Sequence, residues 1–224
     1  MWGLGDYGWA GFQEITARYY GHVALIDDMV ARIVAHLEAL RMAEDTVVIF
    51  TSDHGDCMGA HQLIEKGEIK YEEISRIPLV VAHPDCEQPG STTETFVYLH
   101  ELTPSIIDIA GADVPEHMDG ASFLPAMLGD QTPNGRDEVY CVFDRHFTRA
   151  DQRMVRTHTH QLTFNAADPG ELYDLVADPY QLENVYGQTA YEEVRLDLMA
   201  RMKRYMIELD DPLYGWFSRM SPVY

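Results

Sequence analysis

Val47-Val48-Ile49-Phe50-Thr51-Ser52-Asp53-His54-Gly55-Asp56 is a short apolar run that gives way at once to polar residues. Four consecutive apolar residues at 47–50 are typical of a buried strand. In open α/β sheets, ligands bind beyond the carboxyl ends of the strands. Asp53 and His54 follow this strand directly, so the sequence predicts that both side chains lie at a ligand-binding edge.

The residues before this strand predict a long helix at about 13–42, because apolar side chains recur there mostly at steps of three and four. A short polar link at 43–45 joins the helix to the strand, a succession typical of a crossover in a mostly parallel sheet. A second strand is expected at 77–82 and a further helix at 101–111. We therefore expect an α/β fold class for residues 1–133, with part of a mixed, mostly parallel sheet flanked by helices.

The pattern changes after residues 129–136, where Gly, Pro, Asn and other turn-forming residues gather. The periodicity of residues 190–208 predicts a closing helix. Residues 134–224 are therefore expected to form a small C-terminal antiparallel subdomain with a terminal helix. Its strands are expected in three short segments, at 139–143, 152–156 and 161–164.

The composition argues against several classes of protein. Hydrophobic residues make up 46% of the 224 residues, enough to build a core, so extended disorder is not expected. The formal net charge is -21, which disfavours nucleic acid and membrane surfaces as partners. No apolar run approaches the ~20 residues that span a bilayer.

The compartment is left open between the cytoplasm and the periplasm. Cys57, Cys86 and Cys141 lie far apart and form neither a disulfide framework nor a zinc ribbon. That spacing fits a reducing compartment and leaves room for one disulfide. The first residues lack the basic and apolar regions of a secretory signal peptide.

Asp53 and His54 are candidate metal ligands. A carboxylate and an imidazole side by side can bind one cation, with imidazole suited to Zn, Mn or Fe and carboxylate to Ca, Mg or Mn. Two ligands do not complete a site, so the others must come from elsewhere. The alternative interpretation is a polar turn at the strand end, capped by the aspartate.

Lys66 and His61 are candidate substrate-binding residues. An ammonium group at Lys66 could neutralise a sulfate or phosphate ester and stabilise a departing alkoxide. His61 could donate to an anionic oxygen or protonate a leaving group. A solvated lysine and a loop histidine with one backbone hydrogen bond are the alternatives. No activated nucleophile is visible, and neither a GxGxxG sequence, a P-loop nor a GxSxG elbow occurs.

Several motifs together resemble the sulfatase family, within the alkaline phosphatase superfamily. Residues 51–56, Gly59-x-His61, Lys66-Gly67 and residues 71–81 resemble its second signature region almost throughout. The resemblance covers essentially the whole chain, with further matches at 102–111, 119–125 and 171–184.

The resemblance implies a sulfuric ester hydrolase that acts on a small-molecule or carbohydrate sulfate ester. It implies a formylglycine nucleophile, made from Cys or Ser in a C/S-x-P-x-R motif, and a divalent cation, calcium first, with manganese or magnesium as alternatives. Asp53 and His54 match the family's later pair of metal ligands. Lys66 matches the catalytic lysine that contacts the sulfate and the leaving-group oxygen, and His61 lies at a substrate-binding position of the motif.

The chain also departs from the family pattern. No C/S-x-P-x-R sequence occurs, and the acidic ligands of the family's N-terminal strand are missing, so the resemblance is to the C-terminal half alone. Gln161 stands where many relatives have lysine. We expect that the isolated chain is inactive and is completed by the missing N-terminal half or in a homo-oligomer.

Two other functions stay open. The Asp-His pair, in place of Asp-Asn, keeps a phosphonate monoester or phosphodiester hydrolase of the same superfamily as an alternative. The missing nucleophile keeps a non-catalytic fragment or binding module as a second one.

Overall fold

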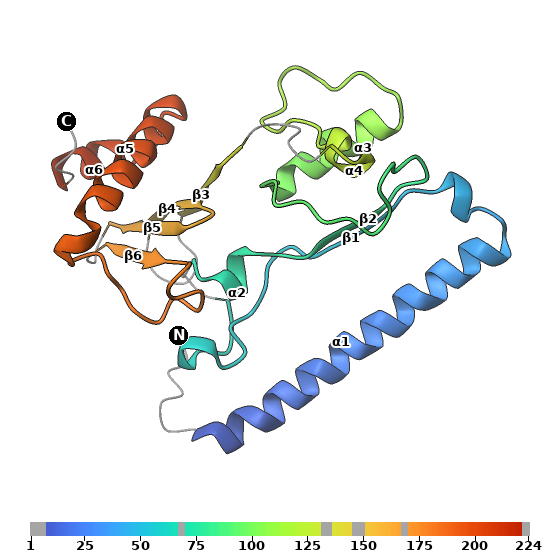
Figure 1. Cartoon of the computed structure of the whole chain (residues 1–224), viewed down its shortest axis with the longest axis horizontal. Helices are drawn as coiled ribbons and strands as arrows, with labels where there is room; N and C mark the ends of the chain where they lie inside the picture. Colours follow the sequence, from blue (N-terminus) through green and yellow to red (C-terminus); the bar gives the residue numbers. More distant parts are fainter. Residues whose placement is uncertain (1–7, 67–69, 131–135, 145–150, 167–169, 221–224) are drawn as a thin grey trace. The chain divides into compact units, whose positions relative to one another are not determined.

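The computed structural model describes residues 8–66, 70–130, 136–144, 151–166 and 170–220 (Figure 1). The chain divides into two compact units. The first comprises Met1–Glu65 and Arg76–Gly135, and the second comprises Lys66–Ser75 and Arg136–Tyr224.

The first unit begins with the long helix α1, Gly8–Ala39, followed by the 3-10 turn η1, Ala43–Asp45. This helix was expected from the apolar periodicity. The chain leaves it through Arg41, whose φ of 57° breaks the helical path. Thr46 Oγ1 then donates a hydrogen bond to the Met42 carbonyl at 2.7 Å. These local features direct the chain from the helix into the strand.

Two strands of the first unit, β1 (Val48–Thr51) and β2 (Leu79–Ala82), pair side by side. The mixed helix and sheet class that the sequence predicts is confirmed. One feature of it requires correction: β1 and β2 run antiparallel, with Ile49 opposite Val81. The chain enters β2 in the direction opposite to β1, because residues 52–78 join the two strands as a reversing loop and not as a crossover. Within the described residues the expected parallel neighbours of β1 have no counterpart.

The helices α3 (Leu102–Ile109) and α4 (Leu124–Leu128) complete the first unit, with the short turns η2 (Ala60–Gln62) and η3 (Leu99–Glu101). Ser105 joins the two helices, since its buried Oγ donates to the Glu101 carbonyl at 2.7 Å and accepts from the Phe123 amide at 2.9 Å. Gly120 lies against η3, and a Cβ there would be 3.2 Å from Glu101 Cα. A glycine is therefore required at this point for close packing.

The second unit is built on a four-stranded antiparallel sheet, which confirms the predicted C-terminal subdomain. Its strands lie in the order β3-β4-β5-β6. The helix α5, Glu192–Glu208, follows the sheet as expected. The short helix α6, Tyr214–Met220, was not predicted. The remaining elements are β3 (Glu138–Asp144), β4 (Asp151–Thr157), β5 (His160–Asn165), β6 (Glu171–Asp174), η4 (Thr189–Tyr191) and α2 (Glu72–Ser75).

One face of this sheet packs against α5 and α6 to form the hydrophobic core. Leu162 and Leu172 from the sheet meet Met202 and Met206 from α5, and all four are buried. Phe217 from α6 packs edge-on against Phe164, with ring centroids 5.1 Å apart. Full burial of such a side chain contributes about 1.5–3 kcal/mol. This core makes the sheet a rigid support for whatever binds to its strands.

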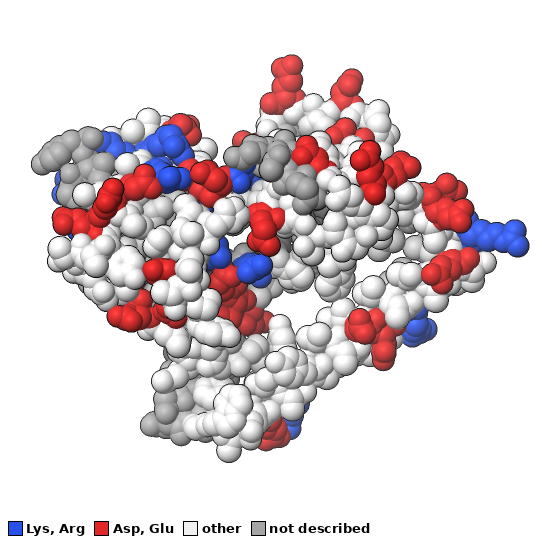
Figure 2. Space-filling model, viewed as in Figure 1, with Lys and Arg blue, Asp and Glu red and all other residues white. Residues whose placement is uncertain are grey.

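Among the charged side chains on the visible surface, acidic ones are more prominent than basic ones, in keeping with 37 Asp and Glu against 16 Lys and Arg (Figure 2). Among the described residues, none of the helices combines the length and the apolar composition that a membrane span requires.

Candidate functional site

The carboxyl end of β1 is held in a tight turn by two hydroxyl groups. Thr51 Oγ1 donates to the Pro78 carbonyl at 2.8 Å, which ties the end of β1 to the residue just before β2. Ser52 Oγ donates to the His54 carbonyl at 3.0 Å and closes the turn around Asp53. The turn therefore fixes the backbone that carries the two candidate metal ligands.

Asp53 and His54 lie close enough to act on one cation. The His54 amide donates to Asp53 Oδ1 at 3.0 Å, and His54 Nε2 lies 3.4 Å from Asp53 Oδ2. The Asp53 side chain is 79% exposed and the His54 side chain 32% exposed. The pair is thus open to a ligand that approaches from outside the turn.

The other ring nitrogen of His54 decides the tautomer. His54 Nδ1 lies 3.1 Å from the Gly55 carbonyl, and a carbonyl oxygen can only accept a hydrogen bond. Nδ1 therefore carries the proton, and in the neutral ring Nε2 presents its lone pair toward the Asp53 carboxylate. This is the arrangement that metal-binding histidines adopt, with one nitrogen held by the protein and the other left for the cation.

His54 Nε2 and Asp53 Oδ2 lie 3.4 Å apart, and in the neutral tautomer both are electron-pair donors. A divalent ion could bind both atoms, so the donor pair fits one side of a metal site. Calcium takes six to eight oxygen ligands. No group of three or more His, Cys, Asp or Glu suited to a metal occurs among the residues described here. The pair supplies a part of a site, and further ligands have to complete it.

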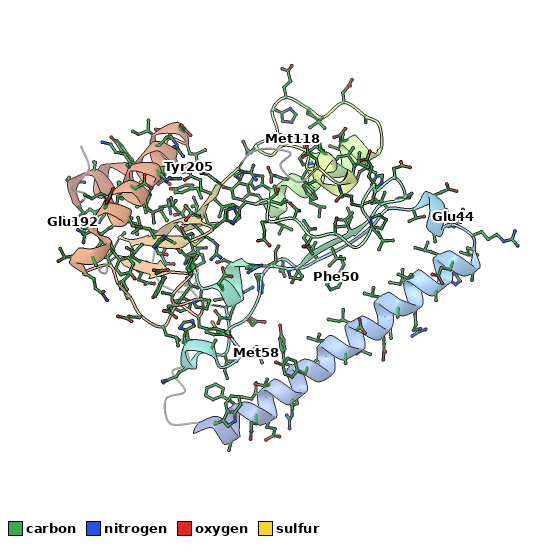
Figure 3. The ribbon with its side chains drawn as sticks, in the orientation of Figure 1. Glu44, Phe50, Met58, Met118, Glu192 and Tyr205 are labelled. Atoms are coloured by element: carbon green, nitrogen blue, oxygen red, sulfur yellow. The ribbon has the colours of Figure 1, made fainter. Side chains whose placement is uncertain are left out.

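His61 lies in a strained loop of the first unit. Its φ is 53°, and Met58 and Gln62 also have positive φ values, 45° and 60°. Such a conformation costs about 1–3 kcal/mol for each non-glycine residue, and strain of this kind concentrates at functional sites. The loop lies beside the first turns of α1, where Thr16 Oγ1 donates to the Met58 carbonyl at 3.5 Å (Figure 3).

Gly59 explains how this loop approaches α1. A Cβ on Gly59 would be 3.2 Å from Cδ1 of Phe12, the one buried residue in α1. Its φ of 109° is also favourable for glycine alone. Packing on Phe12 therefore holds the strained loop in place, and the motif glycine that precedes His61 has a structural reason.

Lys66 belongs to the second unit and is exposed, whereas Asp53, His54 and His61 belong to the first. The structure brings Asp53 and His54 together. The convergence of Lys66 and His61 with that pair stays a prediction.

The residues that follow Lys66 are bound to the C-terminal sheet by side chains that the sequence analysis missed. Gln161 Nε2 donates to the Lys70 carbonyl at 2.6 Å, and Arg156 forms an ion pair with Glu72. The Glu72 amide donates to Gln181 Oε1 at 2.8 Å. These partners lie far apart in the sequence, and no local pattern connects them.

Comparison with known proteins identifies the family. Residues 59–208 match the family described as N-sulphoglucosamine sulphohydrolase, C-terminal. The chain therefore belongs to this family, within the sulfatases of the alkaline phosphatase superfamily, as the motifs predicted.

Three similar proteins illustrate this likeness. An N-acetylglucosamine-6-O-sulfatase of Bacteroides thetaiotaomicron is 27% identical over 207 residues, covering 89% of this chain and 37% of that protein. A protein solved in complex with its substrate D-glucosamine-2-N,6-O-disulfate has a TM-score of 0.79 and 26% identity, over 85% of this chain and 40% of that one. The phosphonate monoester hydrolase of Agrobacterium radiobacter has a TM-score of 0.81 and 28% identity, over 88% and 42%.

The chain spans about two fifths of the length of its curated relatives, from 37% to 40% for three of them.

Proposed function

We propose that this chain is the C-terminal part of a sulfuric ester hydrolase, in which Asp53 and His54 bind a divalent cation and Lys66 binds the sulfate. Membership of the sulfatase family supports this assignment. The observation that carries it is the orientation of His54, whose Nδ1 is held by the Gly55 carbonyl while Nε2 faces Asp53 at 3.4 Å.

Each of these residues has a definable part in the reaction. Asp53 and His54 hold the cation, which when bound offsets the negative charge of the sulfate oxygens. The Lys66 ammonium contacts a sulfate oxygen and the bridging oxygen, and stabilises the alkoxide that develops as the S–O bond breaks. His61 donates to an anionic oxygen or protonates the leaving group. The nucleophile, formylglycine in this family, comes from a part of the protein that this sequence does not contain.

We further propose calcium as the cation, with manganese or magnesium as alternatives, because the exposed Asp53 carboxylate is a hard oxygen donor. The substrate is a carbohydrate sulfate ester. The names of the similar glucosamine sulfatase and of the protein solved with a glucosamine disulfate support that substrate class.

A partner completes the site in this proposal. Large apolar side chains are exposed on α1 and on the β1–β2 pair, among them Trp9, Ile33, Phe50 and Val80. Phe50 is labelled on β1 in Figure 3. The missing N-terminal half would cover these side chains and add the remaining ligands, and a second copy of the chain is the other possible partner.

Calorimetric titration of the chain with calcium, manganese and magnesium tests the metal assignment. We expect weak binding of one ion, since the pair supplies two ligands, and loss of that binding in Asp53→Asn and in His54→Ala. Asp27→Asn on α1 is the matched surface control. Binding that survives both site variants would refute the assignment of Asp53 and His54.

Turnover of an aryl sulfate tests the need for a partner. The isolated chain is expected to show no turnover, and sustained activity of the purified chain alone would contradict the proposal that it is completed by another polypeptide.

A phosphonate monoester or phosphodiester hydrolase is the second candidate function, favoured by the likeness to the Agrobacterium enzyme. Side-by-side rates of the completed enzyme on an aryl sulfate and on an aryl phosphonate distinguish the two functions. Binding of calcium and sulfate without turnover of either ester would favour a non-catalytic module.

A further inference from the structure

We propose that Arg156, Gln161 and Gln181 position Lys66, by fixing the segment Lys70–Ser75 on the C-terminal sheet. This inference rests on the proposed function, in which Lys66 binds the sulfate. It assigns to the C-terminal subdomain a part in the reaction that its fold alone does not indicate.

The three side chains come from three different elements and grip the same short segment. Arg156 lies on β4, Gln161 on β5, and Gln181 in the turn after β6. The hydrogen bonds and the ion pair reach two residues of the segment, Lys70 and Glu72.

Two of the contacts fix the backbone of the segment. Gln161 Nε2 donates to the Lys70 carbonyl at 2.6 Å, and Gln181 Oε1 accepts from the Glu72 amide at 2.8 Å. Glu72 is the first residue of α2, and the first amides of a helix lack partners within it. Each glutamine therefore satisfies a main-chain group that the segment cannot satisfy itself, and together they define where the backbone lies.

The third contact is the ion pair between Arg156 and Glu72. The Arg156 side chain is 15% exposed and that of Glu72 is 20% exposed, so solvent screens their attraction less than on an open surface. Arg156 Nη1 also donates to Gln161 Oε1 at 3.3 Å. The arginine thus orients the glutamine that holds Lys70, and the contacts form one connected network.

Gln181 occupies a strained conformation to make its contact. It is 1% exposed and has a φ of 54°, a backbone conformation that is unfavourable for a non-glycine residue. Its amide donates to the Asp178 carbonyl at 3.1 Å, within the turn that imposes this geometry. Backbone strain at a buried residue is expected where the orientation of its side chain matters. Here the oriented group is the Gln181 side-chain amide, whose Oε1 accepts from the Glu72 amide.

Aromatic contacts also hold the side chains of Lys70 and Tyr71 against the sheet. The ring of Tyr71 meets that of Tyr173 edge-on, with centroids 6.0 Å apart. The Lys70 ammonium lies 4.9 Å from the centroid of Phe143, and burial lowers the pKa of Lys70. The side chains of Lys70 and Tyr71 therefore both pack on the C-terminal sheet.

The consequence for Lys66 follows from chain length. Four residues span at most about 14 Å, at roughly 3.3–3.6 Å per residue, so fixing Lys70 keeps the Lys66 backbone within that distance of the anchored segment. Lysine has a long side chain with many rotamers, and a positioned backbone leaves less conformational freedom to lose when an anion binds. Arg156, Gln161 and Gln181 are positioning residues in this sense, since they act through Lys66.

The sequence provides a direct probe, because it contains three lysines, Lys66, Lys70 and Lys203. Lysine-selective ¹³C and ¹⁵N labelling of the full chain should give one amide and one ε-CH₂ signal for each. Inorganic sulfate is the ligand for titration. In Arg156→Ala, we expect the Lys66 amide signal to shift and the sulfate dissociation constant read at Lys66 to rise about 5- to 10-fold, while Lys203 stays unchanged.

Further variants separate positioning from folding. Glu72→Gln removes the same ion pair from the other side, and Gln181→Ala removes the backbone acceptor, so each should reproduce the effect. The exchange Arg156→Glu with Glu72→Arg should restore the Lys66 signal. Arg195→Ala is the matched control, since Arg195 contacts the Tyr186 carbonyl in the same subdomain.

Two results would count against different statements. If Lys70 responds to the variants while the Lys66 amide does not, the segment is anchored without positioning Lys66, and this inference is overturned. If sulfate leaves the Lys66 ε-CH₂ signal of the unaltered chain unmoved, the assignment of Lys66 as a sulfate ligand fails. The response of the Lys66 amide then still decides the positioning statement.

Discussion

Arg153 and Asp211 form a buried two-point ion pair, in which Arg153 Nε donates to Asp211 Oδ2 at 2.5 Å and Nη2 donates to Asp211 Oδ1 at 3.0 Å. The pair joins the centre of β4 to the turn between α5 and α6. Tyr140 from β3 also donates to Asp211 Oδ2, at 3.0 Å. One carboxylate therefore connects two strands to the chain segment that closes the C-terminal subdomain.

Removing one partner of this pair should be costly. Arg153→Met leaves the Asp211 carboxylate buried without its cation, so the free energy of unfolding should fall by about 3–5 kcal/mol. The double variant Arg153→Met with Asp211→Leu should recover part of that loss. Urea unfolding followed by circular dichroism measures both, and a loss below about 1 kcal/mol for Arg153→Met would show that the pair is not a stabilising contact.

Acid should weaken the same contact. Burial alone would raise the pKa of Asp211, but hydrogen bonds from Arg153 and from the Leu213 amide outweigh burial and lower it below its usual value. A carboxylate whose pKa is lower in the folded state adds stability that is complete above its unfolded pKa, near ~3.9, and is lost as pH falls through the folded value.

We therefore expect the urea midpoint to fall as the pH drops below about 4, and Asp211→Asn to flatten this dependence. Asp27→Asn, at an exposed position of α1, serves as the comparison. An Asp211→Asn variant with the same acid dependence as the parent chain would contradict this assignment.

Replacing glycine by alanine should have opposite effects on stability at Gly120 and Gly21. A Cβ at Gly120 would lie 2.8 Å from His100 Cδ2 and 3.2 Å from the backbone Cα of Glu101, so Gly120→Ala should cost about 1–3 kcal/mol through overpacking. Gly21 lies inside α1 with nothing within 4 Å of its ideal Cβ. Gly21→Ala should therefore stabilise by about 0.5–1 kcal/mol. Thermal unfolding of both variants tests the contrast, and equal shifts would be inconsistent with it.

Manganese offers a spectroscopic test of the candidate metal pair. The ion is paramagnetic, so it should broaden the ring signals of His54 at concentrations that leave the other histidines, such as His22 and His160, unaffected. Excess calcium should restore the His54 signals if both ions bind the same site. Uniform broadening of all histidine signals would instead show non-specific binding to the acidic surface.

The sequence allowed the regular elements and one part of the site to be predicted. The period of apolar residues located α1, and alternating short segments located the strands of the C-terminal sheet, since both patterns are local. The adjacency of Asp53 and His54 at the end of β1 was likewise visible in the sequence. The position of the His54 ring was not, because it depends on the turn that brings Nδ1 to the Gly55 carbonyl.

Long-range pairing was the part that sequence could not supply. The antiparallel partner of β1 is set by the path of the loop between the strands, which no local pattern encodes. The ion pair of Arg156 with Glu72 joins residues far apart in the chain, so no local pattern connects the two charges. The short helix α6 lacked a periodic signal because it is only 7 residues long.

The exposed apolar side chains of α1 and β2 also bear on how the chain behaves in solution. With a formal net charge of -21, copies of the chain repel one another at low ionic strength, and this repulsion opposes aggregation through the exposed apolar side chains. At ~0.15 M salt the range of that repulsion shrinks to about 8 Å. The isolated chain should therefore aggregate more readily as the salt concentration rises. A partner that covers the apolar side chains would remove this salt dependence.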